Sequence, residues 1–154
     1  EIRLSLVGSE MCIRDRLNIT GSALTAERFR TDIILQNIAN QNTTRTEDGG
    51  PYRRRQVVLR ENTMSFEAQL DKAVNKTDGG GVYAEQVVES GNPFVPVYDP
   101  EHPDADADGY VMMPNVNSAE EMVDLMAASR AYEANLTALN IAKSMAMKAL
   151  EIGK

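Results

Sequence analysis

The acidic segment between Pro103 and Pro114 carries the residues whose types and spacing come closest to a known chemistry. Its alternating carboxylates and the glycine that follows them are Asp104, Asp106, Asp108 and Gly109. They match the D-x-D-x-D-G opening of a calcium-binding loop, in which alternate carboxylates ligate the ion. The twelfth position of such a loop needs a bidentate Glu, and Asn115 stands there. The two prolines also oppose the flanking helices of that motif. The pattern favours a solvated acidic loop and predicts no metal site.

Other residues that could do chemistry lack the partners they would need. His102 is the only histidine, and it stands in a polar loop without a neighbouring nucleophile. The glycines at 79–81 lack the Lys and the helix of a phosphate-binding loop. Cys12 is the only cysteine, so neither an internal disulfide nor a cysteine metal site is possible. The sequence predicts no catalytic residue, no cofactor and no enzyme.

The charges are distributed unevenly along the chain, whose formal net charge is −7. Every charged residue between Thr77 and Ser129 is acidic, whereas Arg53, Arg54, Arg55 and Arg60 form a basic group. The acidic balance argues against nucleic acid as a partner. The asymmetry suits association with copies of the chain or with its relatives. We expect the carboxylates of the acidic loop to lie against the basic group of a neighbouring subunit and to fix register there.

The stretch from Ser118 to Ile152 predicts one long helix, since it holds no Gly or Pro and Gly153 follows it. Ser118 and Glu121 have the spacing of a capping box. One apolar seam repeats with heptad spacing and two polar interruptions. The seam consists of Met122, Leu125, Ser129, Tyr132, Leu136, Leu139, Lys143, Ala146 and Leu150. Apolar residues also extend around the helix, which suggests packing on more than one side.

A second amphipathic helix is predicted from Leu17 to Asn40. One face carries small and branched apolar residues, and Asn37 and Asn40 lie near it. The assembly residues predicted on this face are Ile19, Ala23, Ala26, Ile33, Asn37 and Asn40. A second apolar strip lies on the far side, so the helix has two packing partners. The two asparagines are placed to satisfy the last carbonyls of the helix or to adopt a left-handed conformation.

Between the two helices, residues 45–117 have the period of strands and loops. Strands are predicted at Tyr52–Arg60, Val82–Glu89 and Pro93–Tyr98, the last confined to a sheet edge by its prolines. Residues 66–73 read as a helical turn or a connector, and residues 99–117 as an extended loop. The fold class is therefore α+β, with long N- and C-terminal helices packed as a coiled coil around a small β-rich insert.

Four segments follow from these patterns. Residues 1–16 carry no clear period and read as a non-native leader. Residues 17–44 and 118–154 form the N- and C-terminal helices of an inner assembly domain, and residues 45–117 form the insert. No run of eighteen apolar residues exists, which predicts no membrane insertion. No signal peptide is recognisable either.

Two groups of motifs resemble the axial proteins of the bacterial flagellum, the rod and hook family. The run from Asn37 to Thr44, Asn-Ile-Ala-Asn-Gln-Asn-Thr-Thr, is similar to the N-terminal motif shared across that family. The run from Tyr98 to Asn117 is more specific, together with Glu121–Asp124 and Ser129–Asn135. These motifs resemble the proximal-rod members, and the resemblance covers residues 17–154.

The resemblance implies a structural subunit of the rod that transmits motor torque for motility. Its terminal helices would line a tubular assembly, with other rod subunits and basal-body components as partners in a hetero-oligomeric helical assembly. The location implied is the basal-body rod, which crosses the periplasmic space. A flagellar type III system would export the chain without a cleaved signal peptide. The alternatives are another rod or hook axial protein and, from a different class, a calcium-dependent binding module built on the loop from Asp104 to Asp108.

Overall fold

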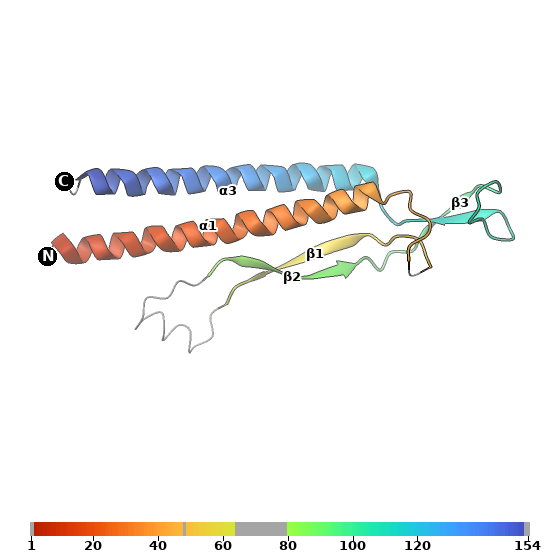
Figure 1. Cartoon of the computed structure of the whole chain (residues 1–154), viewed down its shortest axis with the longest axis horizontal. Helices are drawn as coiled ribbons and strands as arrows, with labels where there is room; N and C mark the ends of the chain where they lie inside the picture. The colour runs from red at the N-terminus through yellow and green to blue at the C-terminus, as the bar shows by residue number, and fades with distance from the viewer. Residues whose placement is uncertain (1, 48, 64–79, 153–154) are drawn as a thin grey trace. The chain divides into compact units, whose positions relative to one another are not determined.

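A computed structural model describes residues 2–47, 49–63 and 80–152, and within these the side chains from Asp15 to Glu151. The elements in chain order are α1 (Ile2–Ala39), β1 (Arg55–Glu61), β2 (Val82–Glu89), β3 (Val95–Tyr98), β4 (Tyr110–Met113) and α3 (Ser118–Ile152) (Figure 1). Two long terminal helices in contact, with small two-stranded sheets between them in the chain, confirm the predicted α+β class. The predicted helical turn at residues 66–73 lies outside the described residues.

The bounds of α3 match the predicted helix, but its cap differs from the prediction. Asn117 caps the helix: its Oδ1 accepts a hydrogen bond from the Ala119 amide at 3.1 Å, and its carbonyl accepts from the Glu121 amide at 3.0 Å. The predicted capping box of Ser118 and Glu121 was wrong. The physical reason is that the Glu121 side chain is buried and bonds to residues far away in sequence. Asn and Ser are equally favourable N-cap residues, so capping by Asn117 stabilises the helix as well as the predicted cap would.

Helix α1 begins at Ile2, before the predicted start at Leu17, and ends at Ala39. The interpretation of residues 1–16 as a non-native leader stays a prediction. At the C-terminal end, Asn40 Nδ2 donates to the Gln36 carbonyl at 2.9 Å. This bond confirms that Asn40 satisfies one of the last carbonyls of the helix. Asn37 does not, because its side chain is used elsewhere.

The chain divides into two compact units. The first comprises Glu1–Arg28, Leu59–Glu85 and Ser129–Lys154, and the second Phe29–Val58 and Gln86–Ala128. Each unit contains a segment of α1 and a segment of α3, which lie side by side (Figure 1).

In the first unit, the start of β2 is fastened to α1. The Val82 amide donates to Ser22 Oγ at 3.1 Å, and the Asn62 amide donates to the Gly81 carbonyl at 2.8 Å. Gly81 has φ +104°, and a Cβ there would collide with Ser22. Glycine at this position therefore serves both the backbone conformation and the close approach to the helix. Strands β1 and β2 form one two-stranded sheet.

In the second unit, β3 and β4 form an antiparallel pair with Val95 opposite Met113 and Tyr98 opposite Tyr110. The predicted extended loop at residues 99–117 was thus wrong in part, since it contains β4. The bounds of β2 are as predicted. Strand β1 begins at Arg55 rather than Tyr52, and β3 at Val95 rather than Pro93.

Few of the described side chains are buried. The buried apolar residues are Ala26, Ile33, Ile34, Tyr52, Val111 and Ala128. Many large apolar residues are exposed instead, among them Met126, Met145 and Leu150 on α3. Such an excess of exposed apolar surface is typical of a protein that associates with others. Within the described part of the chain, neither helix has a stretch apolar enough and long enough to cross a membrane.

Candidate assembly site

A buried polar cluster joins α1, the segment before β1, and α3 within the second unit. Its members are Asn37, Tyr52, Arg54 and Glu121, whose exposed fractions are 1%, 7%, 7% and 1%. Burying this much polarity is costly unless every group finds a partner. The cluster meets that condition, so its geometry is tightly specified.

Asn37 uses its full hydrogen-bonding capacity. Its Nδ2 donates to the Arg55 carbonyl at 2.8 Å and to Glu121 Oε2 at 3.0 Å. Its Oδ1 accepts from the Tyr52 hydroxyl at 2.9 Å and from the Arg55 amide at 3.0 Å. An amide side chain offers two donor hydrogens and two acceptor lone pairs. A single residue of α1 therefore fixes the chain entering β1 and the first turn of α3 together.

Arg54 is surrounded by carboxylates from the first turns of α3. Its Nε donates to Glu121 Oε1, and its Nη2 lies 3.1 Å from Asp124 Oδ2 and 3.3 Å from Glu120 Oε1. The backbone amide of Arg54 donates to Asn115 Oδ1 at 2.8 Å. Asp124 also lies 3.9 Å from Arg30 Nη2 on α1. Negative charge at a helix N-terminus is additionally favoured by the helix dipole.

The pKa values in the cluster follow from this arrangement. Burial lowers the pKa of Arg54, but the hydrogen bond to Glu121 and the charges of Glu121, Glu120 and Asp124 outweigh it, and the net pKa is raised. The guanidinium therefore stays charged. Burial raises the pKa of Tyr52, with Arg55 acting against it. Tyr52 stays a neutral hydroxyl donor to Asn37.

The three arginines of the basic group other than Arg54 are also engaged within the chain. Arg55 pairs with Glu89 at 3.7 Å, and Arg60 with Glu85 at 2.7 Å. The guanidinium of Arg53 lies 4.4 Å from the centroid of the Phe94 ring. The two ion pairs join β1 to β2, and the Arg53 contact joins the segment before β1 to the segment after β2.

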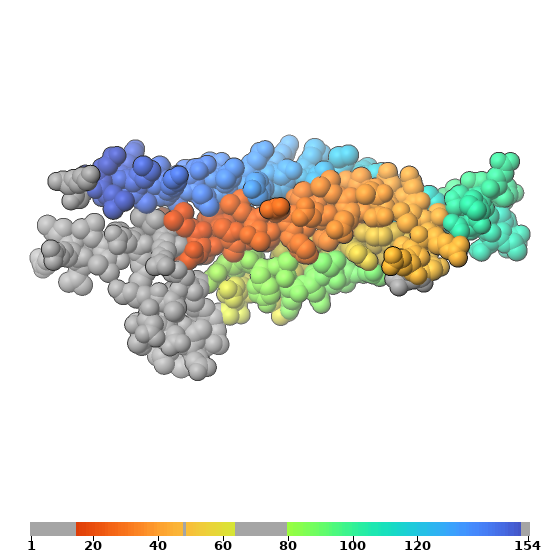
Figure 2. Space-filling model, in the orientation of Figure 1, coloured from red at the N-terminus to blue at the C-terminus, as the bar shows by residue number. Residues whose placement is uncertain are grey.

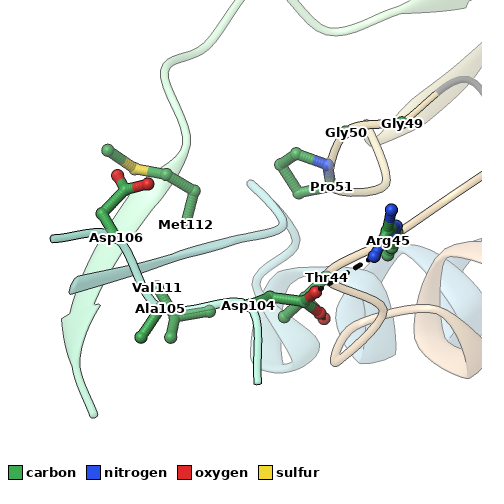
Figure 3. A pocket seen from close by; sticks show the side chains of 10 residues that line it. All are labelled: Thr44, Arg45, Gly49, Gly50, Pro51, Asp104, Ala105, Asp106, Val111 and Met112. Carbon is green, nitrogen blue, oxygen red and sulfur yellow. Dashed lines mark hydrogen bonds and ion pairs between the residues drawn. The ribbon is translucent and has the colours of Figure 1, made fainter. Parts of the chain in front are cut away.

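The acidic segment is attached to the turn after α1. Asp104 Oδ2 accepts from Thr44 Oγ1 at 2.9 Å, and Asp104 Oδ1 lies 3.8 Å from Arg45 Nη1. A hollow of about 350 Å³ lies beside this contact, lined by residues of the turn and of the acidic segment (Figure 3). Asp106 and Asp108 are exposed. In the described residues, no group of three or more His, Cys, Asp or Glu side chains is arranged to hold a metal.

The structure separates the predicted α1 assembly residues into two sets. Ala26, Ile33 and Asn37 are buried within the chain, and Ala23 and Asn40 are half-buried. Ile19 is 43% exposed. Most of the first strip is therefore occupied by the chain's own residues. On the far side of α1, Leu35 is 47% exposed.

On α3 the predicted seam is mostly exposed. Met122, Tyr132, Leu136 and Leu150 are 50%, 38%, 42% and 66% exposed, and Ser129 and Lys143 are exposed too. Leu125, Leu139 and Ala146 are half-buried. The most covered residues of α3 lie largely one position earlier, at Glu121, Ala128, Ala131, Asn135, Ala142 and Ala149. Within the chain, α3 thus uses a strip of small residues and leaves larger side chains outward.

Sequence reasoning missed the buried ion pair of Arg54 and Glu121 at the centre of this cluster. It assigned Glu121 to a cap and Arg54 to a surface group, although both are buried. The sequence does contain both parts of the cluster, the Tyr-Arg-Arg-Arg run at residues 52–55 and the acidic first turn of α3. A buried Arg needs carboxylates around it. No spacing in the sequence shows which arginine of the run is the buried one.

The arrangement is suited to holding elements together. Comparison with known proteins shows the family of the chain. Residues 107–152 match the family described as flagellar basal body rod FlgEFG protein C-terminal. The flagellar basal-body rod protein FlgC of Bacillus subtilis (strain 168) is 46% identical over 144 residues, covering 90% of this chain and 96% of that protein. FlgC of Borreliella burgdorferi is 44% identical over 143 residues, which are 88% of this chain and 94% of that protein. FlgC of Salmonella typhimurium is 42% identical over 144 residues, with 94% and all of the two chains covered.

The chain belongs to the FlgC family of flagellar basal-body rod proteins. It is a structural protein of bacterial motility and not an enzyme, as the sequence predicted. Membership in the FlgC family decides against both alternatives, another axial protein and a calcium-dependent binding module.

Proposed function

We propose that this FlgC-family chain assembles into the proximal rod through its terminal helices, with the α3 seam as the main contact to neighbouring subunits. The observation that carries the proposal is the exposure of the seam in the single chain. Large apolar residues recur along it at heptad spacing, and four of them are 38–66% exposed. Burying each such side chain in an assembly contributes about 1.5–3 kcal/mol, reduced here because each is already partly covered. Several in a row can hold a subunit in a rod.

The partners proposed are other rod subunits and basal-body components, in a hetero-oligomeric helical assembly that transmits torque. The proposed location is the rod where it crosses the periplasmic space, reached by type III export without a cleaved signal peptide. The relatives support the rod itself through their description as basal-body rod proteins. The two terminal helices support the mode of assembly, because each retains an apolar strip outside the chain's own core.

The acidic loop is proposed as a second contact with a neighbouring subunit. Asp106 and Asp108 are exposed and available for it, whereas Asp104 is held by Thr44 and Arg45 of the same chain. The arginines first considered as its partners, Arg53, Arg54, Arg55 and Arg60, are each engaged within their own chain. A contact through the loop then needs a different basic surface.

The test of the seam is Leu136→Asp. We expect cells carrying it to export the subunit but to build no rod and not to swim, because a buried unpaired carboxylate in the assembly costs several kcal/mol. The free subunit should lose no more than about 1 kcal/mol of stability, since Leu136 is 42% exposed there. The measurements are swarming on soft agar, immunoblots of exported protein and electron microscopy of basal bodies.

The matched control is Ser144→Asp, which adds the same charge on an exposed position of α3 outside the seam. It should assemble and swim. Normal motility of the Leu136→Asp strain would remove the seam from the mechanism.

A further inference from the structure

The hairpin of β3 and β4 has two unlike faces. Residues directly opposite each other in an antiparallel pair point to the same side. Val97 and Val111 therefore share one face, on which Val111 is 2% exposed and covered by the chain, while Val97 is 44% exposed. The other face carries Pro96 opposite Met112 and Tyr98 opposite Tyr110. We call these four residues the hairpin face.

The hairpin face is apolar and uncovered. Tyr98, Tyr110 and Met112 are 65%, 45% and 44% exposed, and the two rings meet edge to face with centroids 5.4 Å apart. Figure 2 shows most of the hairpin's atoms free of other elements on the side in view. Tyr and Met are enriched in protein interfaces. A ribbon of two short strands is only marginally stable by itself, so a partner over this face would add to its order.

A carboxylate lies at the edge of this face. Asp106 and Met112 line the same hollow, and Figure 3 shows their side chains on one side of the hairpin, with Val111 and Ala105 on the other. The Asp106 amide donates to the Tyr110 carbonyl at 2.9 Å, which holds the backbone of Asp106 beside the hairpin face. From residue 93 to residue 117, every charged side chain is acidic. The occupant of the hairpin face should be apolar and basic.

The second half of α3 meets this description. Between residues 134 and 150 the only charged side chains are Lys143 and Lys148. Ile141, Met145 and Lys148 follow one another at spacings of four and three, so they form one strip along the helix. Ile141 and Met145 are 50% and 53% exposed, and Lys148 is exposed. This outer strip is separate from the seam of Leu136 and Leu150, and it is free when the seam is in use.

We propose that the hairpin face of one copy docks on the outer strip of α3 of a second copy, with Asp106 beside Lys148. This inference rests on the proposed function, since it adds a contact between copies to the helix packing of the rod. The apolar residues supply most of the attraction, and the charge pair sets the register.

Disulfide trapping tests the contact. Two full-length chains are expressed together in a Cys12→Ser background, one with Met112→Cys and the other with Met145→Cys, each with its own epitope tag. Rods are isolated and treated with a mild oxidant. We expect a mixed disulfide between the two tagged copies. The matched control replaces Met145→Cys by Met126→Cys, whose Met is 51% exposed on the same helix. Its yield should be at least about tenfold lower.

Charge reversal supplies a second readout that a merely structural role would not move. Asp106→Lys and Lys148→Asp should each lower the yield of mixed disulfide by up to about fivefold, as expected for an exposed pair. The two reversals placed on opposite copies should restore it. Where a cysteine variant builds no rod, the same pairs are oxidised in concentrated mixtures of the purified subunits, and that yield decides.

The outcomes are distinct from those of the proposed function. Rods that form normally but give equal yields with Met145→Cys and Met126→Cys would overturn the contact and leave the rod role intact. A disulfide from Met112→Cys to another rod protein would overturn the choice of a second copy. Absence of the wild-type subunit from isolated rods would instead contradict the proposed function itself.

Discussion

At the scale of single residues, Glu121 of α3 forms a buried hydrogen bond to Asn37 of α1. One of its carboxylate oxygens accepts from Asn37 of α1, and the other accepts from Arg54. A buried ion pair adds little net stability relative to well-packed apolar groups, but removing one partner is costly. The cluster therefore acts more through specificity than through strength: it allows one register between the helices.

Glu121→Gln tests this role. The amide keeps the shape but leaves Arg54 buried with weaker compensation, and it brings hydrogens where two acceptors are needed. We expect the free energy of unfolding of the purified subunit to fall by about 3 kcal/mol, at the low end for a broken buried pair because Asp124 remains close. Urea unfolding monitored by circular dichroism measures it.

Glu120→Gln is the control for that substitution. It removes the same charge from the neighbouring position, also within reach of Arg54, but the Glu120 side chain is 58% exposed. Its effect should stay below about 1 kcal/mol. Equal effects of the two substitutions would show that the cluster acts only as diffuse surface charge.

At the scale of elements, long helices and strands with a regular residue pattern were predictable from the sequence. The pairing of short strands was not. The bounds of α3 followed from an uninterrupted run of helix formers, and those of β2 from its branched and aromatic residues. Strand β4 was missed because it is four residues long and its partner β3 lies across an acidic, proline-containing loop. Pairing between segments so separated leaves no local period to detect.

Gly109→Ala probes that missed pairing. Gly109 has φ +79°, and a Cβ there would lie 3.0 Å from Tyr98 Cε2 and 3.3 Å from Pro100 Cβ. We expect the substitution to destabilise the hairpin by about 1–2 kcal/mol, because alanine resists this backbone conformation and crowds the ring. NMR chemical shifts and amide exchange of residues 95–98 and 110–113 report the loss.

The control for the hairpin is Gly91→Ala, where an added Cβ meets nothing within 4 Å. It should leave both strands unchanged. If Gly109→Ala is as well tolerated as Gly91→Ala, the turn before β4 does not depend on its left-handed glycine.

At the scale of the whole molecule, the sequence indicated an assembly protein through its excess of apolar strips, but it could not divide those strips between inside and outside. Which strip is covered depends on the register between α1 and α3. The bonds among Asn37, Arg54 and Glu121 help to fix that register. The seam at Leu136 and the covered strip at Asn135 differ by one position, which no heptad pattern resolves.

Amide exchange along α3 should reflect this division. In a verified monomer we expect the amides around Ala128, which is 0% exposed, to be protected. Those from Tyr132 to Leu150 should exchange much faster, because few large side chains are covered there and local opening costs little. Mass spectrometry of deuterium uptake in the free subunit and in isolated rods compares the two states. Strong protection of Tyr132–Leu150 in the monomer would mean that the helices are self-sufficient.

The bond between Asn37 and Glu121 joins residues 84 positions apart. It sets the order in which a subunit can become complete. Whichever terminus becomes available first, most of the chain has to follow before Arg54 meets its carboxylates. Until then α1 lacks the partner that fixes its register against α3. The subunit therefore reaches its final form only when residues from both ends of this 84-residue span are present together.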